Sequence, residues 1–133
     1  MTHPRYFVAV FGDPQPPNKD LVESGIYHPN SQYAPFPVAP GDIMLLYCTN
    51  GYVQHAMEVP GLGVVLDFNN QCVNYRWLPF VDPIPKLTID QQFDASDLSH
   101  FGLIRFDRFW LFEISQSSFS KTVGAANIAW QHL

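Results

Sequence analysis

Charged residues, and basic residues above all, are scarce in this 133-residue sequence. They make up 14% of it, against about a quarter in an ordinary globular protein. Only seven residues are basic, and the net charge at pH 7 is −5. A protein that grips a long duplex needs many phosphate contacts, so this composition argues against that class of nucleic-acid-binding protein.

Cysteine is rarer still, and no long apolar run is present. Cys48 and Cys72 stand far apart without a Cys-x-x-Cys motif, and the five histidines are scattered, so we predict neither a metal site nor a cofactor. No apolar segment reaches about 18 residues and no charged leader precedes an apolar one, which predicts neither a membrane span nor secretion. We therefore expect a cytoplasmic protein with reduced thiols.

Apolar and aromatic side chains are abundant instead. Hydrophobic residues reach 47%, with eleven Phe, six Tyr and three Trp. A chain of this length forms one domain, residues 1–133, and buries roughly two thirds of the surface that its unfolded form exposes. The surplus of aromatic area either fills the core of a small barrel or lines a ligand pocket.

Apolar runs bounded by turn residues predict a protein built mainly from strands. The pair Pro40-Gly41 suits a type II turn, since proline presets φ at the first central position and glycine accepts a positive φ at the second. Asn69-Asn70 suits a tight hairpin turn. The expected strands cover residues 6–11, 43–48, 53–59, 63–68, 72–78 and 103–114.

Two short helices and one long loop complete the predicted organisation. Thr88 and Gln91 have the spacing of a capping box for a helix over residues 89–93, and Ser115 caps a second helix that ends near Gly124. Residues 13–40 contain seven prolines. This segment is longer than a loop that only connects two strands, and loops of this length usually have a functional role. We interpret this segment as a pocket lid with one helical turn near residues 19–24.

Several of these features occur together in one known superfamily. The turn Val38-Ala39-Pro40-Gly41-Asp42 leads into a strand that ends in Tyr47-Cys48-Thr49, a later strand carries Tyr75-Arg76-Trp77, and residues 106–123 fit a final strand and helix. Over residues 39–124 the sequence resembles the PUA-like superfamily, in particular EVE-type domains, which are related to YTH and ASCH domains. The fold that this resemblance implies is α+β: a small mixed β-barrel of about five to six strands, with short helices covering its ends.

The resemblance also implies a function. In prokaryotes, domains of this type resemble the specificity modules of modification-dependent restriction systems. The implied function is non-catalytic recognition of a modified or flipped nucleobase, in single-stranded or locally opened RNA or DNA, through an aromatic pocket. The positions that fall in the pocket region are Ile26, Tyr27, Tyr47, Thr49, Asn50, Trp77 and Trp110. Strand pairing can gather Arg76, Arg105 and Arg108 on a rim that contacts phosphate.

The pocket residues have distinct expected roles, each with a structural alternative. Tyr47 offers a stacking face, while Thr49 and Asn50 supply hydrogen bonds to the edge of a base; the alternative is an ordinary turn after a strand. Tyr27 and Tyr33 are lid aromatics, or they pack the loop onto the barrel. Alternation along residues 73–78 places Val73, Tyr75 and Trp77 on one face and Asn74 and Arg76 on the other. Trp77 and Trp110 are pocket walls or core residues, and the arginines of the rim are phosphate contacts or solvated edge residues.

No catalytic constellation stands out. Glu58 with Asp67 and Cys48 with His55 are the nearest approaches to an acid-base or a nucleophile-base pair, and nothing in the sequence orients either pair or lowers a thiol pKa. We therefore predict a protein without catalytic activity. The alternative to base recognition is a protein-interaction or oligomerisation module, such as a homodimer, in which the aromatic surplus forms an interface and no nucleic acid binds.

Overall fold

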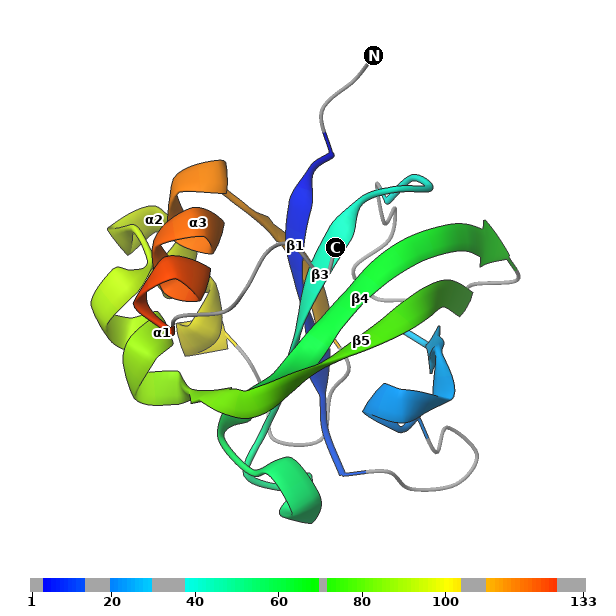
Figure 1. Cartoon of the computed structure of the whole chain (residues 1–133), viewed down its shortest axis with the longest axis horizontal. Coiled ribbons are helices and arrows are strands. Elements are labelled where there is room, and N and C mark those ends of the chain that lie inside the picture. The colour runs from blue at the N-terminus through cyan, green and yellow to red at the C-terminus, as the bar shows by residue number, and fades with distance from the viewer. Residues whose placement is uncertain (1–3, 14–19, 30–37, 70–71, 104–109, 127–133) are drawn as a thin grey trace.

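One curled sheet of six strands organises the structure. The computed structural model describes residues 4–13, 20–29, 38–69, 72–103 and 110–126, and within them the strand order is β2-β5-β4-β3-β1-β6 (Figure 1). The strands are β1 (Tyr6–Phe11), β2 (Ile26–Tyr27), β3 (Ile43–Cys48), β4 (Glu58–Asn69), β5 (Cys72–Pro85) and β6 (Trp110–Ile114). The predicted α+β class is confirmed, and the sheet is a half-barrel.

Three short α-helices lie together on one side of this sheet (Figure 1). They are α1 (Lys86–Gln92), α2 (Ala95–Leu98) and α3 (Gln116–Ala125), and the 3-10 segments are η1 (Val22–Ser24), η3 (Val53–His55) and η4 (Ser99–Leu103). Within the described residues, no helix has the length and apolar character needed to cross a membrane.

Strand β1 is buried on both of its faces. It pairs in parallel with β3 and antiparallel with β6. Phe7 and Phe11 point to one face of the sheet and Val8 and Val10 to the other, and all four are fully buried. The continuous apolar run of β1 is therefore what a strand covered on both sides requires.

The two faces of the sheet carry separate cores. On the first, here called the helix face, Val8, Val10 and Tyr47 pack with Ile89 of α1 and Phe119 of α3. The second, here called the strap face, is covered by residues 20–28, which we call the strap. Phe7, Phe11, Met44, Tyr52 and Tyr75 lie on the strap face with Val22 and Tyr27 of the strap itself.

Buried Asp97 joins the helices to one another. Its Oδ2 accepts hydrogen bonds from the Ser118 hydroxyl at 2.6 Å and from the Ser115 hydroxyl at 3.0 Å. The Ser115 Oγ accepts in turn from the Ser118 N–H at 3.0 Å, which caps α3. The predicted cap at Ser115 is thus confirmed, and a network of charge-assisted hydrogen bonds positions α2 against the start of α3.

Strands β4 and β5 form one long hairpin. Asn69 pairs with Cys72 at its tip and Glu58 with Pro85 at its base, so the predicted hairpin is confirmed, although residues 70–71 of its turn lie outside the described part. On the outer edge of β5, β2 pairs only with Val73 and Asn74. Beyond that contact β5 carries prolines at positions 79, 83 and 85, which lack an N–H and suit an edge strand.

Several local predictions hold in detail. The Asp42 N–H donates to the Ala39 carbonyl at 3.0 Å and Gly41 has φ of 91°, as the predicted type II turn requires. Strands β1 and β3 have their predicted bounds. Val73 and Tyr75 are buried on the strap face with Trp77 packed beside them, so the predicted alternation is confirmed.

Other predicted elements are wrong. Residues 53–59 do not form a strand: η3 occupies their first part, Met57 has φ of 63°, and β4 begins only at Glu58. Helix α1 begins at Lys86 directly after Pro85, so Thr88 lies inside the helix rather than at a capping box. Leu103, the expected first residue of the last strand, instead ends η4 (Ser99–Leu103), and among the described residues that strand begins at Trp110; residues 104–109 lie outside the described part.

The predicted lid is only partly visible. Residues 14–19 and 30–37, including Tyr33, lie outside the described part of the chain. Between them the strap contains η1 and the two-residue strand β2, neither of which is a loop. The predicted helical turn near residues 19–24 corresponds to η1. Beyond these corrections, β4 and β5 are longer than predicted, and β2 and α2 were not predicted at all.

Two glycines allow aromatic rings to lie flat against the strap face of β4. A Cβ added to Gly61 would come within 2.7 Å of the Trp77 ring and 2.5 Å of the Leu78 carbonyl oxygen. A Cβ added to Gly63 would come within 2.7 Å of the Tyr75 ring. Each ring therefore fills the space that a side chain on the neighbouring strand would otherwise occupy.

Substitution of Gly61 by Ala is expected to lower the free energy of unfolding by about 2–4 kcal/mol, because the new Cβ collides with backbone and with a packed ring. Urea denaturation of the purified protein measures this. Gly124→Ala is the control: it lies in α3 with open space around the added Cβ, so it should be neutral or stabilise by up to about 1 kcal/mol. Equal stability of the two variants would contradict the close packing.

Candidate functional site

Two of the predicted pocket residues, Tyr47 and Trp110, lie on the helix face at the same end of the sheet, and Thr49 follows Tyr47 closely in the chain. Val10 of β1 pairs with Tyr47 on one side and with Trp110 on the other, so these two side chains share a face and a row. Thr49 continues the ladder, since its N–H donates to the Phe11 carbonyl at 2.9 Å. Thr49 lies one residue beyond the end of β3.

Aromatic rings connect Tyr47 to Trp110. The Tyr47 ring meets Phe101 edge-on at 5.3 Å between centroids, Phe101 meets Phe112 at 5.5 Å, and Phe112 meets Trp110 at 5.5 Å. We call these residues, with His100 and Phe93, the aromatic cluster. His100 stacks on Phe112 at 4.7 Å and is half-buried, as is Phe101. The cluster therefore extends from the core to the surface beside η4.

The polar groups of Tyr47 and Thr49 are poorly satisfied. The Tyr47 hydroxyl donates to the Met57 Sδ at 3.4 Å, and a thioether is a weak acceptor. Thr49 is 5% exposed, and its Oγ1 is buried without a hydrogen-bond partner in the described structure. Buried hydroxyls normally find a partner. These two groups thus offer hydrogen-bonding capacity that the described residues leave unused.

Burial sets the protonation state of Tyr47. Desolvation, followed by electrostatic interactions with the nearby Asp90 carboxylate and Cys48, raises the pKa of its phenol to about 12. Its hydroxyl therefore stays protonated at any physiological pH and acts as a donor.

Met57 and Lys86 border the aromatic cluster. The Lys86 Nζ lies 5.4 Å from the centroid of the Phe101 ring and 2.7 Å from Asp90 Oδ1. Met57 is 44% exposed, and its carbonyl accepts from the Lys86 N–H at 3.0 Å. One cation, paired with Asp90, thus lies close to the Phe101 ring of the aromatic cluster.

Two other predicted pocket residues lie on the opposite face. Tyr27 is fully buried, and its hydroxyl donates to the Val10 carbonyl at 3.0 Å. Trp77 is half-buried and packs against the strap-face core. The sheet separates both from Tyr47, so the structure does not bring the predicted pocket together as one site.

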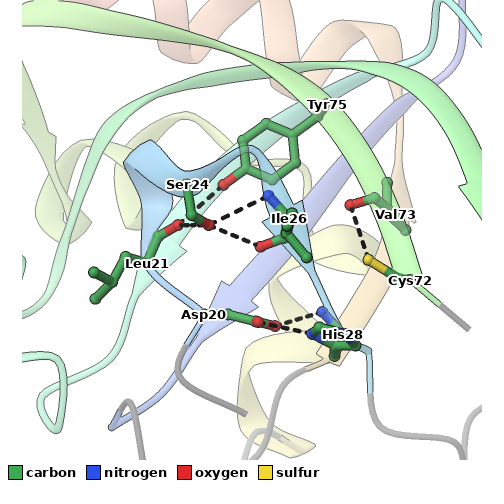
Figure 2. Close-up of polar contacts among 8 residues, drawn as sticks. All are labelled: Asp20, Leu21, Ser24, Ile26, His28, Cys72, Val73 and Tyr75. Carbon is green, nitrogen blue, oxygen red and sulfur yellow. Dashed lines mark hydrogen bonds and ion pairs between the residues drawn. The ribbon is translucent and has the colours of Figure 1, made fainter.

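The strap is held to its face by tyrosine hydroxyls. Tyr52 accepts from the Val22 N–H at 3.1 Å, and Tyr75 donates to the Val22 carbonyl at 2.5 Å. Figure 2 shows the Tyr75 hydroxyl directed at the Leu21 carbonyl, just before η1, to which the Ser24 hydroxyl also donates. These tyrosines of the strap face therefore bond backbone groups, whereas the Tyr47 hydroxyl bonds a thioether.

Asp20, at the start of the strap, bonds to His28 at its end. Its carboxylate is buried and accepts from the backbone N–H of His28, while the His28 Nδ1 lies 2.7 Å from the other oxygen (Figure 2). The thiol of Cys72 lies on β5 nearby, with its pKa raised by burial and then by the Asp20 charge. The thiol is therefore protonated at neutral pH. The described residues contain no group of three or more potential ligands that could hold a metal ion.

The remaining predicted residues do not join the aromatic cluster. Ile26 pairs with Asn74 beside the hairpin tip, and Arg76 lies in the row of Tyr6 and Ile43, at the opposite end of the helix face from Tyr47. Asn50 is exposed in the turn after Thr49, and Arg105 and Arg108 lie outside the described residues.

Neither pair proposed from the sequence for catalysis is supported by the geometry. Glu58 lies at the base of β4, where it bonds His55 at 3.0 Å, and Asp67 lies near the opposite end of the strand. Burial raises the pKa of the Cys48 thiol, which lies in the strap-face core.

Sequence reasoning missed His100, Phe101, Phe112 and Met57. The adjacent aromatic rings at positions 100 and 101 were a usable signal, but their role depends on η4 turning them toward β6. No family model matches the chain, and no curated protein and no solved structure matches it either.

Alkaline pH is expected to destabilise the protein through Tyr47. A free phenol ionises near 10, whereas Tyr47 holds its proton to about 12, so the native state binds more protons than the unfolded state in this window. Stability therefore falls as pH rises from 10 to 12. In Tyr47→Phe the slope should be shallower by about 1.4 kcal/mol per pH unit. Denaturant titrations measure the slope, and a phenolate absorbance difference that places Tyr47 near pH 10 would contradict it.

Proposed function

We propose that this protein is a non-catalytic binding domain that recognises a modified or flipped nucleobase in single-stranded or locally opened RNA or DNA, and that its half-barrel is of the PUA-like, EVE type. One observation carries the proposal: on the face that holds the aromatic cluster the Tyr47 hydroxyl has only a thioether as partner, and the Oγ1 of Thr49, directly after β3, has no hydrogen-bond partner in the described structure. The function is proposed for this cluster and not for the residues on the strap face.

The chemistry of a base matches these groups. An extruded base is read by hydrogen bonds to its edge and by stacking between aromatic side chains, and stacking alone contributes about 1–3 kcal/mol per base. Tyr47 supplies a donor, Thr49 a hydroxyl that both donates and accepts, and Phe101 and His100 the partly exposed rings.

The charge distribution limits how much nucleic acid is bound. Lys86 places one cation beside the Phe101 ring of the cluster, whereas Arg76 lies at the other end of the helix face. With a net charge of −5, the protein positions one or two phosphates at most. We infer a weak dependence of affinity on salt, with a log–log slope of about −0.7 to −1.4 for single strands.

Calorimetric titration with modified and unmodified nucleosides and short oligonucleotides tests the proposal. Loss of one hydrogen bond in Tyr47→Phe or in Thr49→Val should weaken binding about tenfold. Tyr52→Phe is the matched control, because it removes a phenol hydroxyl from the strap face and should leave affinity unchanged. Equal loss in all three variants, or no saturable binding by the native protein, would refute base recognition at this cluster.

A second candidate function is protein interaction or oligomerisation, including a homodimer. Four large apolar side chains are exposed near the base of the hairpin: Val53 (86%), Met57 (44%), Val81 (98%) and Leu87 (63%). Hydrogen bonding between Lys86 and Met57 and pairing of Glu58 with Pro85 bring three of their segments together. Exposed apolar surface of this kind favours a contact with another protein.

If this surface mediates self-association, the melting temperature should rise with protein concentration. Val81→Asp and Leu87→Asp should abolish that dependence, since each buries a charge in the contact. Leu66→Asp serves as the control, because Leu66 is 55% exposed nearer the hairpin tip. Sedimentation that shows one monomeric species at every concentration would remove the homodimer from consideration.

A further inference from the structure

Met57 combines three features that occur together nowhere else in the described chain. Among the non-glycine residues described, it alone has a positive φ, of 63°. Its side chain is 44% exposed, and its Sδ is the acceptor for the buried Tyr47 hydroxyl. Left-handed backbone is unfavourable for a long side chain and persists where the surrounding structure imposes it, commonly at functional sites.

Hydrogen bonds on both sides hold the Met57 backbone in place. Its N–H donates to the Cys48 carbonyl at 3.0 Å, and its carbonyl accepts from the Lys86 N–H at 3.0 Å. Residue 57 thus connects the end of β3 to the start of α1. The thioether is therefore presented to Tyr47 from a fixed position rather than from a freely moving loop.

This arrangement gives the thioether a specific chemistry. A hydroperoxide transfers its terminal oxygen to the Sδ lone pair, the O–O bond breaks, and water or an alcohol leaves as methionine becomes the sulfoxide. The sulfoxide oxygen is a much stronger acceptor than a thioether sulfur. The Tyr47 hydroxyl, already directed at this side chain, is a protonated donor next to the new oxygen.

We propose that Met57 is an oxidation site, and that its sulfoxide is captured by the Tyr47 hydroxyl. Met44, by contrast, is fully buried in the strap-face core and protected from oxidants. A consequence follows that rests on the proposed base recognition: the captured hydroxyl is no longer available to a base, so oxidation closes the site. A methionine sulfoxide reductase would reopen it.

Limited treatment of the folded full-length protein with hydrogen peroxide tests the proposal. Peptide mass analysis should show oxygen added at Met57 at least about tenfold faster than at Met44. The melting temperature is then measured before and after oxidation in the native protein and in Tyr47→Phe. The change on oxidation should be about 2 °C more positive in the native protein, because only the native protein can form the new hydrogen bond. Met57→Leu, which has no sulfur at this position, should show neither oxidation at residue 57 nor this shift.

The outcomes separate this inference from the proposed function. Equal oxidation of Met57 and Met44, or equal shifts in the native protein and Tyr47→Phe, overturns it. Failure of the protein to bind any base leaves both readouts intact and refutes only the proposed function. If a base does bind, oxidation should weaken its binding about tenfold in the native protein and leave it unchanged in Met57→Leu.

Discussion

The parallel pairing of β1 with β3 is the constraint from which the rest of the structure follows. Two parallel neighbours cannot be joined by a tight turn, so the chain must cross the sheet between them. In this protein the crossing passes over the strap face, and its middle is the strap that the hydroxyls of Tyr52 and Tyr75 hold. The opposite face is left to the helices. Burial of β1 on both sides thus requires two covers of different construction.

These two covers leave the faces with different chemistry. On the strap face the phenols of Tyr27, Tyr52 and Tyr75 bond to backbone and stabilise the fold. On the helix face, the backbone hydrogen bonds of the helices are made within the helices and do not involve the tyrosines of the sheet. The Tyr47 hydroxyl therefore has the Met57 thioether as its hydrogen-bond acceptor. The tyrosine hydroxyls therefore bond the backbone on one side of the sheet, whereas on the other side the Tyr47 hydroxyl bonds only the Met57 sulfur.

Features that depend on neighbouring residues could be predicted from the sequence, whereas relations between strands could not. The Pro40-Gly41 turn, the apolar run of β1 and the Ser115 cap depend on near neighbours, and all were predicted correctly. The strand predicted over residues 53–59 failed because one hydrogen bond from the N–H of distant Lys86 and another to the Cys48 carbonyl hold Met57 in a left-handed conformation. For the candidate site, Tyr47 and Trp110 share the face of the aromatic cluster, but their separation from Tyr27 and Trp77 follows from strand register, which a single sequence does not display.

The prolines on the outer edge of β5 have a consequence for the protein in crowded solution. An exposed strand edge is a template on which a second chain can add its own strand and start a fibril. Past the short contact with β2, the edge of β5 has three positions at which no N–H is available for such pairing. The addition of another strand is therefore obstructed along this edge. The curled sheet does not need to close into a full barrel to protect this edge from aggregation, and it can remain an open half-barrel.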